Sequence, residues 1–190
     1  CSSSHPWFQQ FLNDEEPGRR YFIPVPNPNV PWLKGVLRAR NEPLLRSVKT
    51  AAGVRHVWPT YAPDLVDLNW READVCLSFL DLLLESAARG CRVVRLDAFG
   101  YLSKTEGTTC VNQPENHAIL QLLQLVLTEA GAGSMALLPS VTNVSQRENI
   151  AYFGHRERKA DLVYNLPLPA LILHALYAHD ATNLRRYLMD

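Results

Sequence analysis

One strand-like segment of the chain ends in residues suited to nucleophilic chemistry. Arg95 and Asp97 lie two positions apart in it, so on a strand their side chains point to the same face. A neighbouring guanidinium keeps a carboxylate ionised, and the ionised form is the one that attacks an electrophilic carbon. The same two residues are also typical of a structural ion pair at the end of a strand. The residues alone leave both interpretations open.

Two further strand-like segments end in polar residues but lack a carboxylate. Ser140 to Asn143 supplies hydroxyl and amide groups, and Tyr164-Asn165 supplies a phenol and an amide. The chain has no GxSxG, P-loop or GxGxxG sequence, which argues against a serine hydrolase and against a nucleotide-binding protein. Its six histidines are scattered, and its four cysteines lack the spacing of zinc ligands. The sequence therefore predicts no metal site.

Charge and hydropathy exclude two broad classes of protein. The 190 residues hold 19 Lys and Arg against 19 Asp and Glu, so the basic surface of a nucleic-acid-binding protein is absent. No apolar run reaches the roughly 18 residues that a bilayer crossing needs. Cys76 and Cys91 lie in apolar runs and are interpreted as small buried residues, which favours a reducing, cytoplasmic location. The residues from Cys1 onward lack the basic region and the apolar core of a signal peptide, and we expect the chain to be an excerpt of a longer protein.

The elements that must position these residues differ between two parts of the chain. Eight of the thirteen prolines lie between Pro17 and Pro63, which predicts a loop-rich inserted lobe over residues 1–63. From Asp64 onward helix-like and strand-like runs alternate, which predicts an α/β fold with parallel strands. Residues 64–190 are expected to form a partial (β/α)8 TIM-type barrel with about half of its strands. The expected strands are 91–96, 135–138 and 161–164, with short strands in the lobe near 21–23 and 55–58, and the expected helices are 69–90, 114–130, 145–152 and 168–177.

Several ordered motifs resemble those of one enzyme family. The run Arg95-Leu96-Asp97-Ala98-Phe99-Gly100-Tyr101 is similar to its RLDAxGY element. Lys104 and the run Gly107-Thr108-Thr109-Cys110 are similar to its K-x-x-GTSC element, and residues 57–69, 142–154 and 161–175 continue the match. The family is glycoside hydrolase family 13, the α-amylase family, in the branch that contains sucrose, sucrose 6-phosphate and glucosylglycerate phosphorylases. The resemblance covers essentially the whole chain.

The resemblance implies a glycosyl-transferring phosphorylase of carbohydrate metabolism, whose substrates are an α-glucoside and inorganic phosphate. Asp97 would be the nucleophile that forms a glucosyl-enzyme, and Arg95 would orient it. Tyr101 would line the sugar-binding subsite, and Asn143 would lie near it. Retaining transfer of this kind also needs an acid/base carboxyl group about 5–5.5 Å from the nucleophile. The resemblance implies no metal and no organic cofactor.

Two departures from the family pattern bear on activity. The acid/base glutamate of the family directly precedes the T-N-V motif, where this chain has Val141, and valine transfers no proton. The family's third carboxylate is expected beyond Asp190, so this chain alone is expected to be inactive. A half-barrel also has open strand edges through which the chain is expected to self-associate. A catalytically inactive fragment that keeps a sugar-binding scaffold is therefore the alternative function, and an unrelated α/β domain is the third hypothesis.

Overall fold

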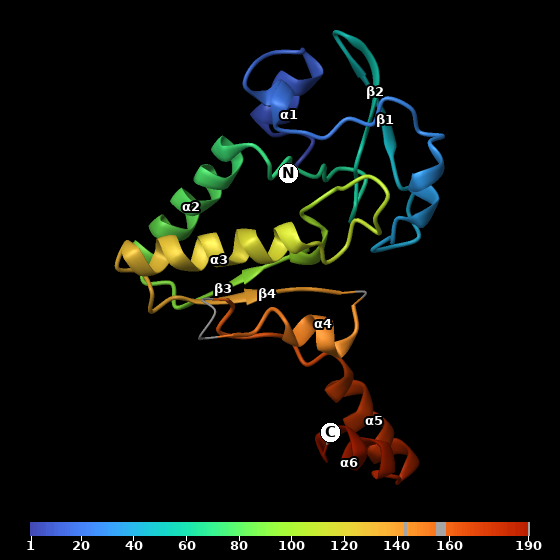
Figure 1. Ribbon diagram of the computed structural model, residues 1–190, viewed down its shortest axis with the longest axis vertical. Coiled ribbons are helices and arrows are strands. Elements are labelled where there is room, and N and C mark those ends of the chain that lie inside the picture. The colour runs from blue at the N-terminus through green and yellow to red at the C-terminus, as the bar shows by residue number, and fades with distance from the viewer. Residues whose placement is uncertain (143, 155–158, 190) are drawn as a thin grey trace.

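The N-terminal part of the chain combines a short helix, two turns of 3-10 helix and a hairpin (Figure 1). The computed structural model describes residues 1–142, 144–154 and 159–189. Helix α1 spans Pro6–Leu12, and the 3-10 turns are Gly18–Arg20 and Pro31–Gly35. The hairpin pairs β1, Arg46–Thr50, with β2, Gly53–Val57, in antiparallel register. The loops between these elements agree with the proline content of the segment.

The two short strands expected in this part have different outcomes. The strand near 21–23 is wrong: Phe22 makes only a single antiparallel bridge with Leu68, and Pro24 has no N–H group with which to extend the ladder. The strand near 55–58 corresponds to the end of β2. Its partner β1 is not predicted, because the sequence RSVKT offers one apolar residue and no alternating pattern.

The second part of the chain contains a parallel strand–helix–strand unit. Helix α2, Ala73–Ala88, leads into β3, Val93–Leu96. Helix α3, Pro114–Glu129, then connects β3 to β4, Ala136–Pro139. The two strands pair in parallel, with Val93 opposite Ala136 and Leu96 opposite Pro139. The described residues therefore have the predicted α/β alternation but form no closed barrel, which is consistent with a partial barrel.

The third strand expected in this part, 161–164, does not form. Leu162 N donates to Leu137 O at 3.4 Å, so the segment runs beside β4. The N–H group of Leu137, however, donates to the Asp161 carboxylate at 3.1 Å. Because a side chain takes the place of the backbone acceptor, the backbone ladder is not completed. This segment is therefore a loop packed along β4 and not a third strand of the sheet.

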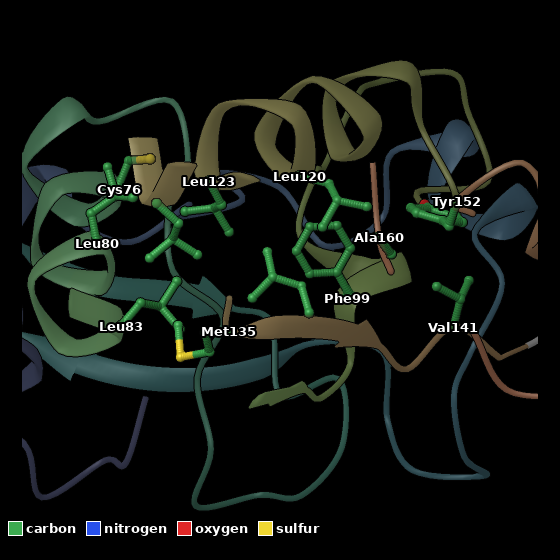
Figure 2. Packing of buried hydrophobic residues seen from close by; sticks show 12 residues of the cluster. Cys76, Leu80, Leu83, Phe99, Leu120, Leu123, Met135, Val141, Tyr152 and Ala160 are labelled. Carbon is green, nitrogen blue, oxygen red and sulfur yellow. The ribbon is translucent and has the colours of Figure 1, made fainter. Parts of the chain in front are cut away.

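The main apolar core lies between the two long helices and the β3–β4 pair (Figure 2). Helix α2 contributes three buried residues and α3 contributes three more, which pack with residues from β4 and from the loops that follow the strands. Burying one such side chain stabilises the fold by about 1.5–3 kcal/mol. This packing fixes the ends of β3 and β4 relative to α3. The buried residues are Cys76, Leu80, Leu83, Phe99, Leu120, Leu123, Leu127, Met135, Leu137, Val141, Tyr152 and Ala160.

A second apolar cluster joins the lobe to the segment that leads into α2. Phe8, Phe11 and Phe22 pack with Val66 and Val75, and the Phe8 and Phe22 rings meet at 5.1 Å between centroids. The cluster thus has members on both sides of residue 63. The division of the chain at that residue stays a prediction.

The N-termini of α4 and α2 differ in how they are capped. Helix α4, Gln146–Ile150, begins with a capping box in which Ser145 and Glu148 bond each other's backbone groups. The similar Asn69–Glu72 pair does not form one, because the Asn69 side chain accepts from Arg71 N at 3.3 Å instead. Helix α2 therefore begins without a side-chain cap.

The C-terminal helices α5, Pro167–Ala178, and α6, Thr182–Met189, have no buried residues. They project away from the remainder of the molecule (Figure 1). Helix α5 was expected over 168–177, whereas α6 was not. None of the helices in the described part of the chain has the length and apolar character that a bilayer crossing requires.

Candidate functional site

The site is built around the turn that follows β3. Asp97 comes directly after the last residue of the strand, and Ala98 adopts a left-handed backbone conformation with φ of 56°. This conformation turns the chain into a 3-10 helix over Phe99–Tyr101. Phe99 N then donates to Ser140 O at 3.1 Å. The backbone around Asp97 is thus tied to the neighbouring strand end of β4.

Arg95 and Asp97 form the ion pair that their spacing predicts. Arg95 Nη2 lies 2.6 Å from Asp97 Oδ1 and 3.2 Å from Ser140 Oγ. Desolvation opposes the charge of the guanidinium, but Asp97 and Tyr164 together raise the pKa of Arg95 above its ordinary value. The Asp97 side chain is 61 % exposed. An accessible carboxylate held beside a permanent cation meets the chemical requirement of a nucleophile.

A cavity of about 190 Å³ lies beside Asp97, with Tyr61 and Tyr101 among its lining residues. The two rings meet edge to face, 5.6 Å apart between centroids and at 89°. Burial raises the pKa of Tyr61, despite its hydrogen bond with Thr142, so the phenol stays protonated at neutral pH and can donate. Aromatic walls with a few polar groups are typical of small-molecule sites. The structure thus brings Tyr101 and Asp97 together at one cavity.

A second carboxylate, Asp67, lines the same cavity. Its Oδ2 lies 2.7 Å from Lys104 Nζ and accepts a hydrogen bond from Thr60 Oγ1 at 2.5 Å. Sequence reasoning did not assign Tyr61, Asp67 or Lys104 to the site, although all three lie in the motifs quoted above. In the part of the chain that the structure describes, no group of three or more His, Cys, Asp or Glu side chains could hold a metal ion.

Val141, one of the positions expected at the site, does not line the cavity. Val141 is 1 % exposed and belongs to the main apolar core, where Figure 2 shows it near Tyr152. The residues on either side of it face the other way: Ser140 contacts Arg95, and Thr142 Oγ1 lies 3.4 Å from Tyr61 Oη. Asn143 lies outside the described residues. The position expected for the acid/base group is therefore occupied by a core side chain.

Solved structures show the class of fold to which this arrangement belongs. The crystal structure of sucrose 6F-phosphate phosphorylase from Thermoanaerobacter thermosaccharolyticum has a TM-score of 0.80 and 24% sequence identity, covering 100% of this chain and 40% of that chain. Trehalose-6-phosphate hydrolase from Bacillus licheniformis has a TM-score of 0.72 and 18% identity, covering 87% of this chain and 31% of that chain. The fold is a partial (β/α) barrel of the glycoside hydrolase family 13 type.

Relatives identified by sequence show the branch of the family to which the chain belongs. Glucosylglycerate phosphorylase of Allomeiothermus silvanus is 40% identical over 183 residues, which cover 96% of this chain and 32% of that protein. Glucosylglycerate phosphorylase of Escherichia coli (strain K12) is 36% identical over 176 residues, covering 92% and 31%. No protein-family model matches the chain. The chain is a partial chain of the sucrose-phosphorylase-like branch of family 13, and it spans about a third of the length of these relatives.

Proposed function

We propose that the chain carries the nucleophile of an α-glucoside phosphorylase and transfers glucose through a covalent intermediate on Asp97. The observation that supports this best is the accessible Asp97 carboxylate, paired to Arg95 at 2.6 Å, at a cavity walled by Tyr61 and Tyr101. In this proposal residues 1–63 form an inserted lobe and residues 64–190 contribute strands to the catalytic barrel. The substrates are an α-glucoside and inorganic phosphate, as for the relatives named phosphorylases.

The chemistry proceeds in two displacements at the anomeric carbon. In the first, an oxygen of Asp97 bonds to that carbon while the bond to the aglycone oxygen breaks, and the departing oxygen must gain a proton. In the second, a phosphate oxygen bonds to the same carbon and the ester to Asp97 breaks, which releases glucose 1-phosphate and restores the carboxylate. Arg95, whose Nη2 lies 2.6 Å from Asp97 Oδ1, orients the carboxylate for the first step and faces the negative charge that returns to it when the ester breaks in the second. Phosphate arrives as an anion, so the second step needs little help from a general base.

The alternative is a catalytically inactive fragment that keeps a sugar-binding scaffold. Its specific support is Val141, which is buried in the core and offers no proton to the departing aglycone. The two functions differ in what happens to a donor whose leaving group needs no protonation. A phosphorylase lacking only its acid/base group still transfers glucose from α-glucosyl fluoride. A scaffold without a working nucleophile does not.

The test uses a chimaera in which this chain replaces the matching segment of the Allomeiothermus silvanus phosphorylase. We expect α-glucosyl fluoride and phosphate to give glucose 1-phosphate, whereas glucosylglycerate reacts about 10²–10⁴ times more slowly than in the parent enzyme. Asp97→Asn should abolish transfer from both donors, because the amide forms no glucosyl ester. Asp81→Asn, on the surface of α2, is the matched control. Transfer that persists in Asp97→Asn contradicts the assignment, and no transfer from fluoride in the unchanged chimaera supports the inactive scaffold.

A further inference from the structure

We propose that Lys104 is a positioning residue of the sugar site. It holds the segment of Asp67 and the loop of Tyr101 together. In this way it sets the distance of the Tyr61–Tyr101 pair from Asp97. The inference rests on the proposed function, since that function makes the two rings the wall of the site.

The Lys104 side chain is almost completely enclosed by protein. It is 3 % exposed, and its Nζ lies 2.7 Å from Asp67 Oδ2. The same nitrogen donates to Tyr101 O at 2.5 Å and lies 5.5 Å from the centre of the Trp58 ring. An ammonium has three donors and no acceptor. Here one carboxylate, one carbonyl and one aromatic face therefore occupy its surroundings.

Two of these contacts lead to the two tyrosines. The carbonyl that accepts from Lys104 belongs to Tyr101 itself. The carboxylate of Asp67 also accepts from Thr60 Oγ1 at 2.5 Å, and Thr60 directly precedes Tyr61. One buried ammonium thus connects the backbone of the first tyrosine to the segment of the second. The two tyrosine rings also contact each other directly, edge to face, with 5.6 Å between their centroids.

Stability alone is a weak reason for a charge in this place. A buried ion pair must overcome the desolvation of both ions, and well-packed apolar residues of similar size are often as stable. The ion pair instead fixes positions, because the ammonium of Lys104 holds the Asp67 carboxylate and the Tyr101 carbonyl at hydrogen-bond distance. Catalytic groups must be held near their productive geometry, and a misplacement of about 1 Å costs about 10²-fold in rate. We therefore assign Lys104 to the placement of the aromatic wall.

The first measurement uses the 190-residue chain with protonated tyrosines in a deuterated background. Variants Tyr61→Phe and Tyr101→Phe assign the ring signals, and the readout is the nuclear Overhauser cross peak between the two rings. The variants are Lys104→Met and the double variant Lys104→Met with Asp67→Asn, which leaves no buried charge unpaired. Lys49→Met, on the exposed side of β1, is the matched control.

We expect the cross peak in the unchanged chain and in Lys49→Met, and its loss in the double variant while the far-ultraviolet circular dichroism stays native. If Lys104→Met alone fails to fold, the double variant still tests whether the ion pair places the two rings. A folded double variant with an unchanged cross peak and unchanged tyrosine shifts overturns the inference, because the rings then hold their place without Lys104.

The second measurement compares rates in the chimaera described above. The double variant should lower kcat/KM for α-glucosyl fluoride by about 10–10²-fold, whereas Lys49→Met should leave it unchanged. A kcat/KM unaltered in the double variant overturns the catalytic part of the inference. If the unchanged chimaera is inactive, the proposed function has failed, and the cross peak still decides whether Lys104 places the two rings.

Discussion

At the residue scale, Val141 occupies the position at which the family resemblance implies an acid/base glutamate. It packs in the main core, and a Cβ added at Gly100 would lie only 3.0 Å from its Cγ1. The Gly100 backbone therefore packs closely against Val141, and a longer side chain at position 141 would have to displace it. A glutamate at position 141 must therefore either remain buried without a partner or leave the core and open a cavity.

We accordingly expect Val141→Glu to lower the free energy of unfolding of the chain by about 2–5 kcal/mol, the cost of burying an unpaired polar group. A buried carboxyl has a raised pKa, so its protonated form is favoured in the folded state. The deficit should be largest at neutral pH and shrink as the pH falls toward about 4. Urea unfolding at several pH values measures it. Val54→Glu, at an exposed position of β2, should have little effect, and an equal loss in both variants would contradict the burial of Val141.

His117 makes a pH-dependent contribution to the free energy of unfolding of the chain. Its ring stacks on that of Tyr152, 4.0 Å apart between centroids. Burial, with a smaller contribution from Lys159, lowers the pKa of His117 below its ordinary value of 6.5. Burial likewise raises the pKa of Tyr152 to about 12, so the phenol stays neutral. The folded state thus holds both rings uncharged.

Since the folded pKa of His117 is below the unfolded one, the unfolded state binds more protons and stability rises with pH in this range. The contribution is complete well above pH 6.5 and is lost as the pH falls through the unfolded pKa toward the folded one. We expect His117→Phe to flatten the fall in unfolding free energy between about pH 7 and 5. A slope identical in His117→Phe and the unchanged chain would refute the prediction.

At the element scale, the first turn of α3 holds the loop that follows Asp97. Asn116 is fully buried, and its Nδ2 donates to Phe99 O at 3.2 Å and to Gly100 O at 2.8 Å. The helix is itself fixed by its apolar face in the core. Packing of α3 is therefore transmitted to the turn after Asp97 through the Asn116 amide group, in addition to the apolar packing of Phe99 in the same core.

We predict that Asn116→Ala destabilises the chain by about 1–3 kcal/mol, because two buried carbonyl groups lose a donor. Leu122→Gln, at an exposed position of the same helix, should change stability by less than about 0.5 kcal/mol. Thermal unfolding of both variants provides the measurement. Equal shifts in the two would mean that the turn is held by its backbone contacts alone.

The elements also show what sequence reasoning can and cannot reach. Helix α3 was predicted almost to the residue, because its apolar period and Pro114 at its start are local signals. The strand expected over 161–164 failed, because the Asp161 side chain takes the hydrogen bond that its backbone would have accepted. That replacement depends on how the segment meets β4, which no local pattern reveals.

The candidate site divides in the same way. Arg95, Asp97 and Tyr101 lie within seven positions of one another, so strand periodicity and one motif sufficed to group them. The contact between Asp67 and Lys104 joins residues 37 positions apart and depends on how the segment of Asp67 packs against the loop that follows β3. Ser140 contacts Arg95 whereas Val141 lies in the main apolar core, and these contacts likewise depend on tertiary packing.

At the scale of the whole molecule, apolar surface is left uncovered on two sides. Helix α5 has Leu173, Leu176 and Tyr177 exposed by 53%, 65% and 84%, and it projects from the body with α6 (Figure 1). The β3–β4 pair is a sheet of two strands, and Val93 of β3 is 50% exposed. Contiguous apolar patches and unpaired strand edges favour association.

We therefore predict that the chain self-associates in dilute solution. Sedimentation velocity over a range of concentrations should show an average mass that rises above 21.4 kDa. Replacing Leu173 and Leu176 with lysine should lower the association, since two charges would then have to be desolvated in any contact through α5. Association that persists in this variant points to the open edge of β3, where Val93→Lys becomes the second variant. A monomer at all concentrations would contradict the prediction and would mean that the exposed faces of this partial barrel are tolerated in water.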